Sequence, residues 1–321
     1  MGYNESMTNV TNKGEQARMQ SDQQELAERI ARALPKDGTV EVQPGVHFSR
    51  SSKPAERVFA TVAPAFCVIA QGSKDILLGE EIFHYDPANY LITTMELPLM
   101  GEVVEASRER PYLSFRWVID PALVTSVMVE SGAVEPRTRG DGMKAVDVNP
   151  LDSTLLDAVL RLVRMTETPD EYRSLAPLVM REIVYRLLRG AQGGRMRHLA
   201  KFGGRAHRMV RAVEKLREQF DQPLKIEGIA RELSMSISGF HAHFKAVTAM
   251  SPLQFQKQLR LQEARRLMLN ENLDAAEAGF RVGYDDAAHF NREYKRHFGK
   301  PPMRDVEGLR EMTAGNVGSG K

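Results

Sequence analysis

The chain has 321 residues, 42% of them hydrophobic and 27% charged, which is typical of a soluble protein with two domains. Its single cysteine, Cys67, excludes an internal disulfide framework and a cysteine-rich zinc site. No apolar run approaches the roughly 20 residues that cross a bilayer, and the N-terminus lacks the apolar segment of a secretory signal. We therefore expect a cytoplasmic protein without membrane contact.

Charge is unevenly distributed along the chain. Residues 201–310 contain 20 Lys and Arg against 14 Asp and Glu, a net charge of +6, whereas the whole chain carries only +2. A basic C-terminal part beside a mildly acidic N-terminal part is typical of proteins that bind nucleic acid through one domain. The alternative is that these cations are only a solvated surface.

The N-terminal segment is polar. Residues 1–22 are rich in Asn, Gln and Ser, which predicts a disordered tail. A short amphipathic helix is expected next, because Leu26, Ile30 and Leu34 recur at a spacing of four.

A β-rich region is expected over residues 40–120. Short runs of β-branched and aromatic residues, such as AFCVIAQG, DILLGEE, YLITT and YLSFRWVI, are separated by Gly, Pro, Asn and Asp. The runs are too short for helices, so they predict antiparallel strands in a small barrel or sandwich. Gly72-Ser73 and Gly79-Glu80 are predicted to form hairpin turns.

The pattern becomes helical beyond Pro121. Apolar stripes within residues 153–166 and 170–189 predict two helices that pack on each other and leave a face for a second subunit. Alternatively, both stripes only cover the β-rich region. The glycine-rich segment 191–204 is the best candidate for a linker.

The segment after the linker contains two similar helical units. In the first, a short helix leads to a turn at Ser234-Met235, and Ser236 is a good N-cap for a second helix with Phe240 and Phe244 on its inner face. Two short helices joined in this way form a helix-turn-helix, whose second helix fits a DNA major groove. The single pattern is a weak signal.

The second unit repeats the first at an offset of 50 residues. Gly283 supplies its turn, Asp285 or Asp286 caps its second helix, and Phe290 and Tyr294 are predicted to face the core. A helix opened by Ser251-Pro252 joins the two units. Two such patterns at a fixed offset are a much stronger indication of DNA binding than one.

Specific residue groups extend this pattern. They are Ser251-Pro252, Arg260-Leu261, Ala264, Gly283-Tyr284, Phe290-Asn291-Arg292, Tyr294-Lys295 and Phe298-Gly299. With these groups the C-terminal part resembles the AraC/XylS family of bacterial transcription regulators. The stretches CVIAQGSKDILLGEEIFHYDPANYLITTMELPLMGEVVEAS and YLSFRWVIDPALV resemble the cupin-like N-terminal domain of one subgroup.

The resemblance implies an α+β protein with a cupin-like β-barrel, flanking helices and an all-α C-terminal domain. The predicted parts are a disordered tail (1–22), a sensing and dimerisation domain (23–190), a linker (191–204), a DNA-binding domain (205–303) and a C-terminal tail (304–321). The implied function is that of a transcription regulator, leaning towards an activator, with double-stranded promoter DNA, RNA polymerase and a small organic effector as partners. A homodimer through helices 153–166 and 170–189 is possible, and no cofactor is expected.

The resemblance also assigns roles on the two recognition helices. The predicted DNA-binding residues are Ser236, Ser238, Gly239, His241, Ala242 and Lys245 in the first unit, and Asp286, Ala287, Ala288, Asn291, Arg292, Lys295 and Arg296 in the second. Arg can bind guanine, Asn can bind adenine, and Ala can contact a thymine methyl group. The family often has Arg where this chain has Ala242, so strong base reading by the first unit depends on His241. Lys245, Lys295 and Arg296 are better suited to phosphates.

The β-rich region lacks the ligands of a metal-binding cupin, because His47 and His84 are far apart. It is therefore expected to hold an apolar effector pocket, with Cys67, Tyr90, Arg116 and Trp117 as lining candidates. Cys67 is more plausibly a buried, inert thiol than a redox sensor.

Three other readings remain open. One is a ligand-independent dimeric DNA-binding regulator. Another is a cupin-type enzyme with an accessory helical domain, for which the sequence offers no acid, base or metal constellation. The third is a DNA-repair methyltransferase, whose chemistry needs more reactive or zinc-bound cysteines than the single one present.

Overall fold

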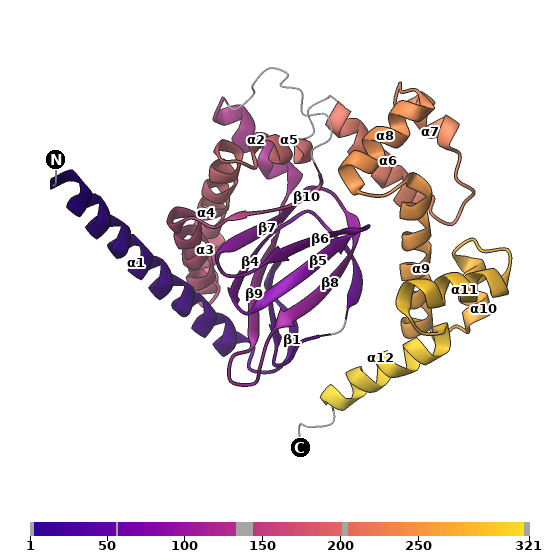
Figure 1. Cartoon of the computed structure of the whole chain (residues 1–321), viewed down its shortest axis with the longest axis horizontal. Helices are drawn as coiled ribbons and strands as arrows, with labels where there is room; N and C mark the ends of the chain where they lie inside the picture. The colour runs from indigo at the N-terminus through magenta and orange to yellow at the C-terminus, as the bar shows by residue number, and fades with distance from the viewer. Residues whose placement is uncertain (1–2, 56, 133–143, 201–204, 318–321) are drawn as a thin grey trace.

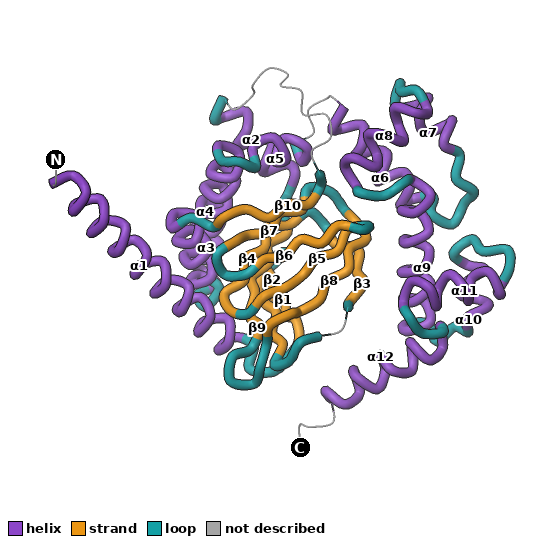
Figure 2. The backbone as a smooth tube through the Cα atoms, viewed as in Figure 1, coloured by secondary structure: helices purple, strands orange, loops and turns teal. Residues whose placement is uncertain are grey.

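The computed structural model describes residues 3–55, 57–132, 144–200 and 205–317. Two β-sheets form the centre of the N-terminal half, with one group of helices on one side and the C-terminal helices on the other (Figures 1 and 2). The predicted α+β arrangement, a β-domain followed by an all-helical domain, is confirmed. No helix in these segments is long and apolar enough to cross a membrane.

The strands pair antiparallel throughout both sheets. The larger sheet has the order β1-β2-β9-β4-β7-β10 and consists of β1 (Gly38–Gln43), β2 (Val46–Ser51), β9 (Tyr112–Val118), β4 (Ala65–Gln71), β7 (Asn89–Thr93) and β10 (Val146–Pro150). The smaller sheet has the order β3-β8-β5-β6 and consists of β3 (Val58–Val62), β8 (Leu97–Glu105), β5 (Ser73–Leu78) and β6 (Glu81–Tyr85).

Strand β4 is apolar and buried from residue 65 to residue 70 because both of its faces are covered. Phe66 and Val68 belong to the core between the larger sheet and the helices, whereas Cys67 and Ile69 belong to the core that includes the smaller sheet. Successive side chains of a strand point to opposite faces, so one apolar run serves two cores.

Five helices pack with the larger sheet or beside it. They are α1 (Tyr3–Ala33), α2 (Pro121–Glu130), α3 (Ser153–Met165), α4 (Pro169–Arg189) and α5 (Gly193–Leu199). Helices α3 and α4 pack on each other, as their apolar stripes predicted. Asp152 begins α3 by accepting a hydrogen bond from the backbone N–H of Leu155 at 2.8 Å.

The N-terminal helix is longer than the sequence suggested. Within the segment 1–22, expected to be disordered, α1 already begins at Tyr3, and Met1 and Gly2 lie outside the described residues. The Ser153 hydroxyl donates to Glu15 at 2.7 Å, and Met19 packs against the core. Because this stretch contacts α3 mainly through hydrogen bonds and ion pairs, it carries no apolar stripe from which a helix could be predicted.

Two further local expectations differ from the structure. Gly72 joins β4 of one sheet to β5 of the other, so it turns a corner between sheets, whereas Gly79-Glu80 forms the predicted hairpin between β5 and β6. Beyond Pro121 the chain is not entirely helical, because β10 returns to the larger sheet beside β7. At five residues, β10 is too short to give a clear period in a helical region.

The expected linker 191–204 is partly ordered. Helix α5 occupies half of it, with Met196 and Leu199 buried in the N-terminal core, and residues 201–204 lie outside the described residues. Gly193 is required here, since a Cβ at this position would lie 2.2 Å from the carbonyl oxygen of Leu188.

The C-terminal helices form the remaining domain. They are α6 (Arg205–Glu218), α7 (Ile226–Glu232), α8 (Ile237–Thr248), α9 (Pro252–Asn270), α10 (Ala275–Arg281), α11 (Ala287–Phe298) and α12 (Pro302–Val317). Helix α12 occupies most of the expected tail 304–321 and buries Val306 completely, so the helical domain extends past residue 303; residues 318–321 lie outside the described residues.

Candidate nucleic-acid interface

The first helical unit consists of α7, a tight turn and α8. Ser234 adopts the left-handed conformation with φ of 53°, and the N–H of Met235 bonds the carbonyl of Ala230 at 2.9 Å. The Ser236 hydroxyl then accepts from the N–H of Gly239 at 3.1 Å and caps α8. The turn and the cap predicted from the sequence are both present.

The second unit repeats this geometry with α10 and α11. Gly283 takes the left-handed position with φ of 89°, and the N–H of Tyr284 bonds the carbonyl of Gly279 at 3.0 Å. Asp286, rather than Asp285, caps α11 by accepting from Ala288 at 2.8 Å. Glycine is needed at 283 because a Cβ would lie 2.1 Å from the carbonyl oxygen of Asp221.

The two second helices present equivalent inner faces. Phe240 and Phe244 of α8, and Phe290 and Tyr294 of α11, are completely buried, as their spacing of four predicts. They therefore stabilise the two units and are not available to stack on bases. Since α8 and α11 are both 12 residues long and lie 50 positions apart, the repeat seen in the sequence is a structural repeat.

The outer faces of α8 and α11 carry the predicted DNA-binding residues. Gly239 and Ala287 are half-buried, and the others are exposed: Ser236, Ser238, His241, Ala242, Lys245, Asp286, Ala288, Asn291, Arg292, Lys295 and Arg296. Exposed donors and small side chains on one face of a helix are what base reading in a major groove requires.

The polar side chains on α11 differ in how free they are. Within the described part of the chain, the side chains of Asn291 and Arg292 form no hydrogen bond or ion pair with another residue. Arg296 is partly engaged, because its guanidinium donates to Glu293 at 2.6 Å. Among the described residues, Asn291 and Arg292, like the exposed Lys295, therefore keep all of their side-chain donors unused on this face.

Arg260 on α9 holds the two units together, a role that the sequence analysis missed. Its Nε donates to the carbonyl of Phe220 at 2.7 Å and its Nη1 to the carbonyl of Gly283 at 2.7 Å, while Nη2 reaches Asp221 and Gln222. One guanidinium thus joins the segment before the first unit to the turn of the second. The Arg260-Leu261 pair was noticed only as part of the family pattern.

The faces opposite the reading surfaces contact the β-domain. The N–H of Ala145 bonds the carbonyl of Val247 at 2.9 Å, and Arg217 on α6 pairs with Glu96. On α11, His297 packs against Phe59 of β3 with ring centroids 4.4 Å apart. Because Asn291 and Arg292 are exposed on the same helix, docking on the sheets leaves the reading face of α11 accessible.

The four candidates for an effector pocket do not lie together. Cys67 and Arg116 are register partners on β4 and β9, on the face towards the smaller sheet, whereas Tyr90 and Trp117 belong to the core on the helix side. Burial raises the pKa of the Cys67 thiol, and Arg116 and Lys74 only partly oppose this. The sequence could not decide which face of the strand is inward.

Neither of two cavities that open to the surface is lined by these four residues. One, of about 510 Å³, lies between the domains and is lined by residues that include Met95 and Glu96 from one side and Val213 and Arg217 from the other. The second, of about 620 Å³, lies between α1 and the β-domain. Both volumes fall in the range of small-molecule sites.

Comparison with known protein families divides the chain in the same way. Residues 43–195 match the AraC-type transcriptional regulator N-terminus, and residues 229–306 match a helix-turn-helix domain. The Msm operon regulatory protein of Streptococcus mutans is 27% identical over 154 residues, covering 47% of this chain and 55% of that protein. The HTH-type transcriptional activator RhaS of Escherichia coli is 25% identical over 158 residues, covering 49% and 55%.

The chain thus spans about half the length of the curated relatives it matches. These relatives and the two matched families are transcription regulators and not enzymes. Among solved structures, ToxT from Vibrio cholerae superposes with a TM-score of 0.53 at 11% identity, covering 81% of this chain and 97% of that one. Its unsaturated-fatty-acid-bound form superposes with a TM-score of 0.51 at 10% identity, covering 85% and 97%. At this identity the likeness establishes a shared fold.

Proposed function

The chain belongs to the AraC family of transcriptional regulators, and from that membership we propose that it binds specific promoter DNA through α8 and α11. The observation that carries the proposal is the pair of equivalent capped helices with free donors on their outer faces. A cytoplasmic location is part of the proposal, because the protein must reach the chromosome.

Base reading is assigned mainly to the second unit. Arg292 would bind guanine through two hydrogen bonds, Asn291 would bind adenine, and Ala288 would contact a thymine methyl group. A good bidentate pair contributes about 1–3 kcal/mol of discrimination against the wrong base. In the first unit, His241 and Ser238 supply the polar contacts, and Ala242 supplies a small apolar one.

Phosphate contacts are assigned to the cations at the ends of these helices. Lys245 and Lys295 are exposed and lie in the last turns of α8 and α11. Contacts of this kind set the position of the protein on the duplex and make its affinity depend on salt. Arg296 would contribute less, since Glu293 already engages it.

The N-terminal domain is proposed to sense a small organic effector. The ToxT structures that share the fold of this chain include a form bound to an unsaturated fatty acid, which supports ligand binding by a protein of this fold. An effector that favours one arrangement of the two domains would shift the population that binds DNA. The relative RhaS is named an activator, which supports activation through RNA polymerase.

A homodimer is proposed through the helices predicted from the sequence, with α4 as its surface. Leu175, Leu178 and Tyr185 are exposed, with 44%, 61% and 46% of their surface accessible, and their spacing places them on one face of α4. Large apolar side chains grouped on an exposed face mark association surfaces. The same exposed apolar face also supports the alternative function, a regulator that dimerises without any effector.

The proposal is tested by selecting fragments of the source genome on the immobilised full-length protein and titrating them by fluorescence anisotropy. We expect a few fragments to bind at least a hundred times more tightly than unrelated DNA at the same salt concentration. The Arg292→Ala variant should reduce this preference, while the Arg32→Ala variant, which changes an exposed arginine on α1, should keep it. Equal affinity for all fragments would refute the proposal.

A further inference from the structure

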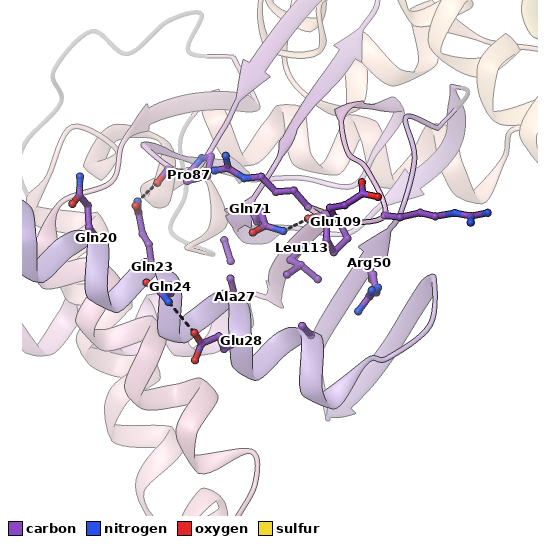
Figure 3. A pocket seen from close by; sticks show the side chains of 15 residues that line it. Gln20, Gln23, Gln24, Ala27, Glu28, Arg50, Gln71, Pro87, Glu109 and Leu113 are labelled. Carbon is purple, nitrogen blue, oxygen red and sulfur yellow. Dashed lines mark hydrogen bonds between the residues drawn. The ribbon is translucent and has the colours of Figure 1, made fainter.

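The larger cavity is formed by one face of α1 and three loops of the β-domain. Gln23, Gln24 and Ala27 line it from α1, and Gln71 and Leu113 from the ends of β4 and β9, as Figure 3 shows. The remaining lining comes from Arg50, the turn at Pro87, the loop 108–111, Ala70 of β4, and Gln20, Glu28 and Ala31 of α1. Its volume of about 620 Å³ suits a molecule of the size of a monosaccharide or larger.

Hydrogen bonds hold the walls of this cavity in place. The side-chain amide of Gln23 donates to the carbonyl of Pro87 at 2.6 Å, and that of Gln71 donates to the carbonyl of Pro111 at 2.7 Å (Figure 3). On the other face of α1, Leu26 and Ile30 are completely buried in the core. The cavity is therefore preformed, which lowers the entropic cost of binding.

The cavity offers more unused donors than unused charged acceptors. Within the described residues, the side chains of Arg108 and Arg110 have no hydrogen bond or ion pair with another side chain. Arg50 is partly engaged, because its Nη1 donates to the carbonyl of Leu34 at 3.4 Å and its Nε lies 3.7 Å from Asp37. The lining holds three arginines against two glutamates, and the guanidinium groups of Arg108 and Arg110 attract anions and can bind a carboxylate through two hydrogen bonds.

The two lining carboxylates are already engaged. Glu28 accepts from the amide of Gln24 at 3.0 Å. Hydrogen bonds from its own backbone N–H and from Ser107 lower the pKa of Glu109. The lining also offers neutral acceptors, among them the amide oxygens of Gln23 and Gln71, which suit the hydroxyl groups of a ligand.

We propose that this cavity binds a small hydroxylated carboxylate of the size of a sugar acid. The arginines at its rim would bind the carboxylate, the glutamine amides would bind hydroxyl groups, and Ala27 and Leu113 would contact the carbon skeleton. This inference rests on the proposed sensing role, and it assigns that role to a site outside the space between the two sheets.

Ion pairs connect this site to the proposed dimer surface. Arg164 on α3 binds Glu25 of α1 through Nε at 2.8 Å and Nη2 at 2.6 Å, and Arg29 binds the same carboxylate at 2.8 Å. Since α3 packs on α4, a ligand that fixes α1 also fixes the support of the α4 surface. The ligand would thereby favour one state of the dimer.

The test measures binding by the full-length protein without DNA, using calorimetry and the thermal unfolding midpoint. The probes are glucuronate, galacturonate and gluconate, with glucose and galactose as neutral controls. We expect at least one acid to bind saturably and to raise the midpoint with concentration, while the neutral sugars do not. Binding by none of the acids, or equal binding by acid and neutral sugar, would overturn the proposal.

Variants locate the site. The double change Arg108→Gln with Arg110→Gln should raise the Kd of the bound acid at least tenfold, whereas Arg32→Gln, at an exposed position on α1 outside the lining, should leave it unchanged. If Arg116→Gln abolished binding while the double variant retained it, the ligand would lie between the sheets and the proposal would be wrong. Promoter binding is measured separately by anisotropy, so failure here leaves the DNA-binding proposal intact.

Discussion

The ring of Phe59 on β3 packs against the imidazole of His297 on α11, with centroids 4.4 Å apart. Phe298 continues this cluster at 4.7 Å from Phe59, and the guanidinium of Arg265 lies 4.4 Å from the Phe298 ring. The second helix-turn-helix unit is thus docked on the smaller sheet through the end of α11. The position of one reading helix therefore depends on the domain proposed to sense the effector.

This contact should weaken in acid. Burial lowers the pKa of His297 to about 4, and the nearby Arg265 and Lys257 act in the same direction, while Glu293 opposes them. A histidine whose pKa is depressed in the folded state binds a proton more readily once its ring has left the contact. Acid therefore favours the state in which the contact is open. The stability of the contact is therefore complete above about pH 6.5 and lost progressively as the pH falls towards 4.

Hydrogen exchange of α11 amides between pH 7 and pH 4 measures this effect after correction for the intrinsic exchange rate. His297→Phe should keep the ring contact, so its α11 amides should not show the loss of exchange protection that acid causes in the unaltered protein. His289→Phe changes an exposed histidine on the same helix and should behave like the unaltered protein. An unchanged pH profile in His297→Phe would contradict the explanation.

Arg292 and Lys295 should affect DNA binding in different ways. Arg292→Ala should cost about 1–3 kcal/mol at one base position and relax the choice of base there, because a base-edge contact is lost. Lys295→Ala should weaken binding to all sequences alike and reduce the salt dependence by about one phosphate contact. Competition anisotropy at three salt concentrations separates the two effects. An identical pattern for both variants would be inconsistent with the assigned roles.

Leu178 should control dimerisation. It is 61% exposed on α4, so Leu178→Glu should leave folding intact while placing a charge in the proposed interface. We expect the dimer Kd to rise by at least about tenfold, which corresponds to about 1.4 kcal/mol. Sedimentation equilibrium measures this, with Ile82→Glu on β6, equally exposed, as the control. A monomeric unaltered protein would exclude the α4 dimer.

Arg260 should be more important for stability than other arginines of the same helix. Its four carbonyl contacts cannot be reproduced by lysine, so Arg260→Lys should lower the free energy of unfolding of the C-terminal domain by about 1.5–3 kcal/mol. Arg266→Lys, which alters exposed ion pairs with Glu263 and Glu271, should change it by less than about 1 kcal/mol. Urea unfolding of both variants provides the comparison.

Local signals in the sequence were enough to find the two helical units. The caps at Ser236 and Asp286, the turn at Gly283 and the inner aromatic pairs all depend on short-range chemistry, and each appears where the sequence indicated. Helix geometry placed the aromatic pairs on the inner faces, whereas the DNA-contacting residues of the outer faces were assigned by the resemblance to the AraC/XylS family.

Long-range arrangements were beyond the sequence. Whether Cys67 or Phe66 faces the smaller sheet depends on how the two sheets stack, since β4 is apolar on both faces. The bonds of Arg260 join residues 23 to 40 positions apart, which no local pattern encodes. The cavity under α1 was missed for a related reason, since it forms only where α1 packs beside the ends of β4 and β9, which are far from it in the sequence.

The most direct test of the account is a hydroxyl-radical footprint of the full-length protein on a selected promoter fragment. Two units that both enter the major groove should protect two segments about one helical turn, roughly 10 base pairs, apart on the same side of the duplex. Arg292→Ala should weaken the protection of the segment bound by α11 and leave the protection of the segment bound by α8 unchanged. A footprint without paired segments, or one that Arg292→Ala leaves unchanged, would contradict the claim that α8 and α11 read the DNA together.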